Sequence, residues 1–235
     1  MSIKPVWVWR CVAAIALILV IVPQIDLAAS RLLFRPVGGF VLSGNAIAVF
    51  MRNGIQALSW GLGLVLTFGA AFAFVRRRIW LRIDGRQWLF LLIALILGPG
   101  LTANVILKTQ WDRARPAHVE AFGGSKRFSP ALVISDQCDH NCSFVSGDAS
   151  TGFFLHSFAY VVLRRRRRLF FGGLAIGALV GGVRMAQGAH FLSDVFYAGL
   201  VVVGVTAASY ALVFGRDALA AWWRQVVFSA EASSA

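Results

Sequence analysis

The chain has 235 residues, of which 58% are hydrophobic and 14% are charged. This composition excludes an ordinary soluble domain and indicates a protein that crosses a membrane several times. The formal net charge of +13 comes from short basic runs between apolar segments, as in loops beside a membrane, so we expect no nucleic-acid partner.

Six apolar segments approach the length of about 20 residues that a membrane helix needs. They lie near residues 6–25, 55–75, 87–107, 144–163, 169–189 and 195–215. The sequence therefore predicts an all-α integral membrane bundle of six helices, which forms a single domain over residues 1–235.

The basic residues predict how this bundle is oriented. The runs Arg76–Arg78 and Arg164–Arg168 adjoin membrane segments, where the excess of lysine and arginine on the cytoplasmic side is strongest. Both termini are then cytoplasmic, and the loops around residues 108–143 and His190 lie on the outer side. We expect the first apolar segment to be retained as a helix rather than cleaved as a signal peptide. The outer segment 40–52 has the pattern of a short interfacial amphipathic helix.

The long outer loop begins with charged residues, in the run Lys108-Thr109-Gln110-Trp111-Asp112-Arg113-Ala114-Arg115-Pro116. Lys108 by itself would be a lysine that extends from a helix end toward water. Lys108 supplies a point charge, however, and Arg115 a planar fork of donors, and the two together suit a phosphate group.

A second group of candidate residues opens the fourth apolar segment, at Ser146, Gly147 and Asp148. Small residues at a helix start expose backbone N–H groups, and the helix dipole favours an anion there. Ordinary helix capping by Ser146 or Asp148 is the alternative.

The third group is Arg184, His190 and Asp194, which are flanked by apolar sequence. Ionisable residues at membrane depth mark functional sites by default. His190 and Asp194 are four residues apart and share one face if they are helical. A carboxylate on one imidazole nitrogen fixes the tautomer and makes the other nitrogen a better nucleophile, whereas a buried structural pair is the alternative.

All three groups fall on the outer side under the predicted orientation. Together they supply what phosphoryl transfer needs, namely cations, helix-terminal amides and a nucleophile with an orienting carboxylate.

These motifs resemble the type-2 phosphatidic acid phosphatase superfamily of membrane lipid phosphatases. The pattern of that family is K-x6-R-P, then P-S-G-H, then S-R-x5-H-x3-D. At the matching positions the chain has Lys108 to Arg115-Pro116, Val145-Ser146-Gly147-Asp148, and Val183-Arg184 to His190 to Asp194. The matched motifs span residues 108–194.

The resemblance implies a reaction without metal or cofactor, in which His190 attacks phosphorus and forms a phosphohistidine. Asp194 would hold His190, and water would then hydrolyse the intermediate. The phosphate oxygens would be bound by Lys108, Arg115, Ser146, Gly147 and Arg184.

The chain departs from the family pattern most seriously at Asp148, where the family has the histidine that protonates the leaving group. An aspartate is usually ionised at neutral pH. Asp148 could still act as the acid once substrate neutralises the nearby cations, or His140 or His118 of the outer loop could supply the proton. The third possibility is a protein that binds lipid phosphates with little catalysis.

Cys138 and Cys142 lie just before the second motif. In an oxidising outer compartment, a disulfide between them would fix the approach to the helix that follows. With His140 they could also suggest a zinc site, but their spacing matches no standard pattern and a fourth ligand is not evident. We therefore expect a disulfide and no metal.

Within the family, Trp111, Arg113 and the run Cys142-Ser143-Phe144-Val145-Ser146-Gly147 look most like bacterial lipid A phosphatases. The expected function is removal of a phosphate from lipid A, a component of lipopolysaccharide, at the periplasmic face of the bacterial inner membrane. Undecaprenyl diphosphate and phosphatidylglycerophosphate are the alternative substrates. A non-catalytic lipid-phosphate binder is the alternative from another class, and the motif spacing does not support a transporter. The oligomeric state cannot be predicted from the sequence.

Overall fold

The computed structural model describes residues 5–77, 79–162 and 164–228. This part of the chain is mostly helical, which confirms the predicted all-α class. The helices, in chain order, are α1 (Pro5–Ile21), α2 (Gln24–Arg31), α3 (Ala46–Arg76), α4 (Gly85–Leu95), the π-helical stretch η1 (Ile96–Leu107), α5 (Lys108–Gln110), the short helices η2 (Pro116–His118) and η3 (Glu120–Phe122), α6 (Gly147–Phe154), the 3-10 helix η4 (Leu155–Tyr160), α7 (Arg166–Ala186), α8 (Leu192–Phe214), α9 (Arg216–Trp223) and η5 (Arg224–Phe228). A two-stranded antiparallel hairpin, β1 (Phe34–Arg35) and β2 (Gly39–Phe40), pairs Phe34 with Phe40.

Four helical segments are long and apolar enough to cross a membrane: Ala46–Arg76, Gly85–Gln110, Arg166–Ala186 and Leu192–Phe214. The pair α1 and α2 becomes a fifth if it is taken as one broken span, since it bends by 89°. The described residues therefore give four or five candidate spans, where the sequence predicts six.

The difference lies in the predicted span 144–163, which forms the short helices α6 and η4. Nearly all of their side chains are buried, chiefly against α7 and α8. Gly173 and Gly177 of α7 permit this close packing, because a Cβ at Gly177 would lie 2.3 Å from the Phe153 ring and one at Gly173 would lie 2.2 Å from the backbone nitrogen of His156. The segment is thus apolar because protein surrounds it, as expected for a helix that is hydrophobic on all sides.

The first turns of α3 replace the short interfacial helix that the sequence predicts at 40–52. The helix begins at Ala46, and the Asn45 side chain caps it by accepting a hydrogen bond from the Ala48 N–H at 3.0 Å. From there it continues without a break to Arg76, because the sequence that follows contains no proline and no run of polar residues. Arg52 therefore lies on the same helix as the predicted membrane segment 55–75.

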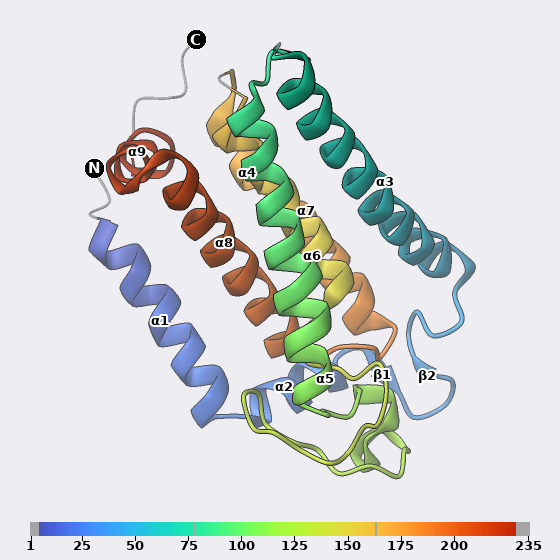
Figure 1. Ribbon diagram of the computed structural model, residues 1–235. Helices are drawn as coiled ribbons and strands as arrows, with labels where there is room; N and C mark the ends of the chain where they lie inside the picture. The colour runs from blue at the N-terminus through green and yellow to red at the C-terminus, as the bar shows by residue number, and fades with distance from the viewer. Residues whose placement is uncertain (1–4, 78, 163, 229–235) are drawn as a thin grey trace.

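Figure 1 shows α1, α3, α4, α7 and α8 as an elongated bundle, with α2, α5 and the short hairpin gathered at one end. The helix α9 lies at the opposite end. There Trp222 of α9 stacks on Tyr160 of η4, with ring centroids 3.9 Å apart. The arginine run that follows η4 is therefore at the α9 end, away from α2 and α5.

Candidate active site

The second motif lies at the start of α6, inside the protein. Ser146 caps this helix, since its hydroxyl accepts a hydrogen bond from the Ala149 N–H at 3.4 Å. Gly147 lies against Asn104 of η1, because a Cβ at this position would come 2.1 Å from the Asn104 side-chain oxygen. Ser146 thus has the capping role that the sequence offers as the alternative to an anion site at this helix start.

His190 is almost fully buried, with 1% of its surface exposed. Its Nδ1 lies 2.7 Å from the backbone carbonyl oxygen of Ser143. A carbonyl can only accept, so Nδ1 must carry the proton. In the neutral imidazole this leaves the lone pair on Nε2, which makes Nε2 the nucleophilic atom.

Asp194 is also fully buried, but it reaches His190 differently from the prediction. Its Oδ2 lies 3.8 Å from Nδ1 of His190, which is too far for a hydrogen bond. The same oxygen accepts hydrogen bonds from the Ser143 hydroxyl at 2.5 Å and from the Phe191 N–H at 2.7 Å. Ser143 therefore joins the two predicted residues: its hydroxyl binds Asp194 and its carbonyl orients His190.

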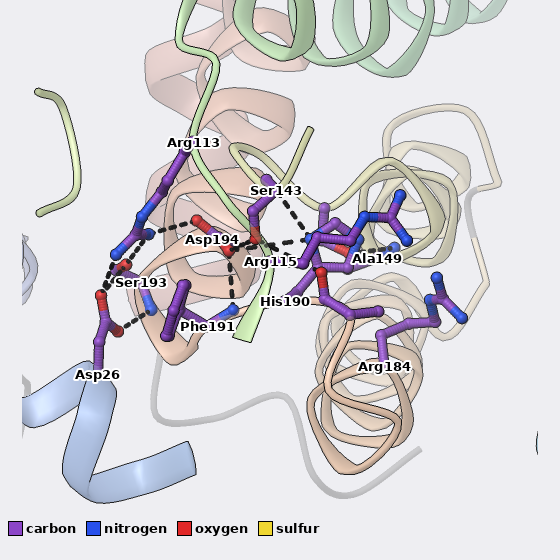
Figure 2. A network of polar contacts seen from close by, with 12 residues as sticks. Asp26, Arg113, Arg115, Ser143, Ala149, Arg184, His190, Phe191, Ser193 and Asp194 are labelled. Atoms are coloured by element: carbon purple, nitrogen blue, oxygen red, sulfur yellow. Dashed lines mark hydrogen bonds and ion pairs between the residues drawn. The ribbon is translucent and has the colours of Figure 1, made fainter. Parts of the chain in front are cut away.

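Arg113 holds the other side of Asp194, and Figure 2 shows this contact. The guanidinium is fully buried and donates from Nη1 to Asp194 Oδ1 at 2.5 Å and from Nη2 to Asp26 Oδ2 at 2.7 Å. It also lies over the Phe191 ring, with Cζ 4.4 Å from the centroid. One arginine is thus paired with two buried carboxylates.

Asp26 comes from α2 and is not among the predicted site residues. It accepts hydrogen bonds from both the backbone N–H and the hydroxyl of Ser193, at 2.8 and 2.5 Å. The sequence does contain a signal for it, because a lone carboxylate between apolar segments is expensive unless it has a partner.

Arg115 and Arg184, two of the predicted phosphate-binding cations, lie on the other side of His190 from Arg113 and Asp26 (Figure 2). Arg115 donates from Nε and Nη2 to the Asn141 carbonyl oxygen, at 3.0 and 2.7 Å. Burial, followed by the positive charge of Arg52, lowers the pKa of Arg115 below its ordinary value. The guanidinium remains charged, because arginine is effectively always protonated in proteins.

Asp148 forms an ion pair with Arg184, whose Nε lies 2.9 Å from Asp148 Oδ2. The two side chains are mostly buried, with 6% of Arg184 and 15% of Asp148 exposed. The residue that replaces the family's histidine therefore contacts one of the predicted phosphate-binding arginines.

Arg52 is a further cation at this site, although the sequence places it in a separate outer segment. It shares a small depression with Asp148 and Arg184, between α3, α6 and α7. Its Nε is buried and has no hydrogen-bond partner within the described ranges. The signal for it is weak, because one arginine at the end of a membrane helix is commonplace.

The predicted cysteine pair is bonded in the structure. A disulfide joins Cys138 and Cys142, whose Cα atoms are 5.6 Å apart. The loop that it closes carries Asn141, the residue that holds Arg115. His140 and His118 are exposed, and in the described part of the chain no three histidine, cysteine, aspartate or glutamate residues form a group that could hold a metal ion.

The surroundings of His190 act on its charge in opposite directions. Burial lowers the pKa of His190 below its ordinary value near 6.5, and the positive charges of Lys108 and Arg115 add to this effect. The carboxylate of Asp194 opposes it. The net result is a lowered pKa, so the neutral, nucleophilic imidazole persists to lower pH than in a free histidine.

Comparison with known proteins gives consistent results over most of the chain. Residues 87–218 match the model of the PAP2 superfamily. A lipid A 4'-phosphatase of Rhizobium leguminosarum is 30% identical over 220 residues, which cover 88% of this chain and 93% of that protein. No solved structure matches.

Two further relatives are more similar over shorter stretches. A lipid A 4'-phosphatase of Francisella tularensis subsp. novicida (strain U112) is 46% identical over 129 residues, or 54% of this chain. A lipid A 4'-phosphatase of Rhizobium etli is 42% identical over 120 residues, or 51% of this chain. The matched stretches span 58% and 47% of these two relatives.

Proposed function

Because this chain belongs to the PAP2 superfamily, we propose that it is a lipid phosphatase that removes a phosphate from lipid A through a phosphohistidine at His190. The observation that carries the proposal is the hydrogen bond from His190 Nδ1 to the Ser143 carbonyl. It leaves Nε2 unprotonated and nucleophilic, in a site that also contains Lys108, Arg115 and Arg184.

The reaction proceeds in two steps. His190 Nε2 attacks phosphorus, the bond from phosphorus to the lipid oxygen breaks, and that oxygen takes a proton from Asp148. Water then attacks the phosphohistidine, returns its proton to the Asp148 carboxylate, and releases inorganic phosphate and free His190. Lys108, Arg115, Arg184 and the amides at the start of α6 bind the phosphate oxygens, where negative charge builds up in the transition state.

Asp148 is the proposed proton donor because its ion pair with Arg184 places it beside a predicted phosphate-binding residue. A phosphate dianion that binds Arg184 takes a partner away from Asp148 and places a like charge beside it. Asp148 is then the carboxyl group beside the bound phosphate, where the leaving group needs its proton. His118 and His140 are the alternative donors, and both are exposed loop residues.

The same ion pair favours a second candidate function. A carboxylate that stays ionised against Arg184 cannot protonate a leaving group, and the protein would then bind lipid phosphates without turning them over. The ability to release phosphate distinguishes the two functions.

The proposed location is the inner membrane of a bacterium, with both termini cytoplasmic and His190 at the periplasmic side. Support comes from the arginine-rich end of α3 and start of α7, which lie toward the α9 end, and from the candidate site at the opposite end (Figure 1). The positive-inside tendency places the arginine-rich end in the cytoplasm.

The test is phosphate release from lipid A, undecaprenyl diphosphate and phosphatidylglycerophosphate by purified protein, in the presence of a chelator. We expect release from lipid A by the wild type and none by His190→Ala. His118→Ala and His140→Ala are matched controls, and a loss of release in either would move the proton donor to that residue. Lipid binding without release from any substrate would favour the binding protein, and a loss of release caused by the chelator would contradict a metal-free reaction.

A further inference from the structure

The group behind His190 contains one cation and two anions. Arg113 donates to Asp194 at 2.5 Å and to Asp26 at 2.7 Å, and all three side chains are at most 1% exposed. The remaining Nε of Arg113 donates to the Ser129 carbonyl at 2.9 Å, which is uncharged. When its three members are ionised, the group carries one excess negative charge in a region shielded from water.

Asp26 also holds the start of α8 in place. It accepts a hydrogen bond from the Ser193 N–H, an amide of the first turn of α8, which has no partner within its own helix. The carboxylate charge is favourable at this positive end of the helix dipole. Because Asp194 follows Ser193 directly, Asp26 fixes the backbone that carries the partner of the nucleophile.

The chain supplies this carboxylate from outside the region that matches the family. The matched region is 87–218, whereas Asp26 lies in α2, beyond the bend that follows α1. A buried carboxylate is costly unless it has hydrogen-bond partners. Arg113 and Ser193 provide them, through four hydrogen bonds to Asp26 and Asp194.

We propose that Asp26 and Arg113 are positioning residues that set the charge behind His190, so that the N-terminal helix pair tunes the nucleophile. The excess negative charge stabilises the positive charge that the imidazole gains as Nε2 bonds to phosphorus while Nδ1 keeps its proton. Arg113 limits this excess, because two unpaired carboxylates would favour a protonated and unreactive His190. The inference rests on the proposed function for its catalytic consequence.

A purely structural role for the group predicts a different outcome from an electrostatic one. Loss of the Asp26 charge leaves the pair of Arg113 and Asp194 with a net charge of zero, which lowers the pKa of His190. Loss of the Arg113 charge leaves two carboxylates and raises the pKa of His190. A structural role gives no reason for shifts of opposite sign.

Other charged groups near His190 stay the same in these variants. They are Lys108 of α5 and Arg115 of the following loop, together with three residues whose charges act on Lys108, namely Asp148 of α6, Arg184 of α7 and Arg52 of α3.

The test is an NMR titration of His190 in the detergent-solubilised full chain with labelled histidine. The chain has four histidines, and the His190→Ala spectrum identifies the signal. We expect Arg113→Gln to raise the pKa of His190 by about half a unit or more and Asp26→Asn to lower it. Shifts of the same sign, or no shift in either variant, would overturn the proposal.

Two variants separate charge from packing. Ser193→Ala removes the hydroxyl that donates to Asp26 and accepts from Arg113 Nη1 at 2.8 Å, without a change of charge. Arg113→Lys keeps the charge while losing the donor fork. Both should leave the pKa of His190 within a few tenths of a unit of the wild type. Asp26→Asn is nearly isosteric and serves as the deciding variant if Arg113→Gln does not fold.

Steady-state rates of phosphate release measure the effect of Asp26 on catalysis. We expect Asp26→Asn to lower kcat for phosphate release by about tenfold or more, with KM changed less than about threefold, as for other residues that orient a reacting group. Glu120→Gln, an exposed carboxylate at the same end, is the matched control. If the wild type releases no phosphate, the proposed function fails, and the NMR titration still decides whether Asp26 and Arg113 set the charge of His190.

Discussion

Arg184 lies 2.9 Å from Asp148, so a proposed phosphate-binding arginine is paired with the residue that replaces the family's histidine. This pair joins two proposed functions of the site, which are phosphate binding and protonation of the leaving group. A phosphate that binds Arg184 therefore competes with Asp148 for the same guanidinium group.

Asp148→Ala should lower phosphate release from a lipid whose leaving group is a sugar alcohol by about 100-fold or more, since general acid catalysis contributes about that much. A diphosphate substrate has a better leaving group and should lose much less. The measurement compares kcat on both substrates, with the exposed Asp139→Ala as control. An equal loss of kcat on both substrates would show that Asp148 is not the acid. Asp148→His, which restores the histidine of the family pattern, should retain activity.

Arg52→Gln should raise KM roughly tenfold with kcat nearly unchanged, because a hydrogen bond to a charged group is worth about that much in binding. The reason is that Arg52 lies beside Asp148 and Arg184 and that its buried Nε has no hydrogen-bond partner in the described part of the chain. Steady-state kinetics on lipid A tests this, with the exposed Arg31→Gln as control. An unchanged KM would place Arg52 outside the substrate contacts.

Cys138→Ser should weaken substrate binding, because the disulfide closes the loop that holds Arg115 through Asn141. The loop is short, so we expect a loss of about 2 kcal/mol or less in the free energy of unfolding. Thermal denaturation and KM give the two effects, and Cys11→Ser, at a free and exposed cysteine of α1, is the control. If KM is unchanged while stability falls, Arg115 does not depend on this loop.

The rate should remain high below pH 6.5. The reactive form of His190 is neutral, and its pKa is lowered by burial, so activity is lost only as pH falls through that lowered value. The acid limb of kcat/KM measures this. A phosphate group of the substrate also titrates near pH 6. If the acid limb reports His190, its midpoint pH should be the same for substrates whose phosphate groups have different pKa values. A limb that follows the substrate, or one above pH 6.5, would contradict the lowered pKa.

The long spans and the motif residues were predictable because each depends on local sequence. The apolar runs of α3, α4, α7 and α8 have the length that a membrane demands, and His190 and Asp194 are close in the chain. The sequence predicts a span at 144–163, where the described residues form the short helices α6 and η4, because an apolar run that protein buries has the same composition as one that lipid surrounds.

The partners of Asp194 could not be predicted from spacing. Arg113 is 81 residues from Asp194 and 87 from Asp26, so these contacts exist only once α2, the outer loop and α8 have packed together. The role of Ser143 was hidden for the same reason, because its carbonyl and hydroxyl meet His190 and Asp194 across the fold. The pairing of Asp148 with Arg184 likewise depends on how α6 packs on α7.

The most direct test of the nucleophile is to quench the reaction of the purified protein with lipid A labelled in its phosphates within a single turnover. Peptides are then mapped under conditions that preserve phosphohistidine. We predict an acid-labile phosphate on Nε2 of His190, which forms and decays at the rate of phosphate release and is absent in His190→Ala. Phosphate release without label on His190, or with label on another residue, would contradict the proposed mechanism.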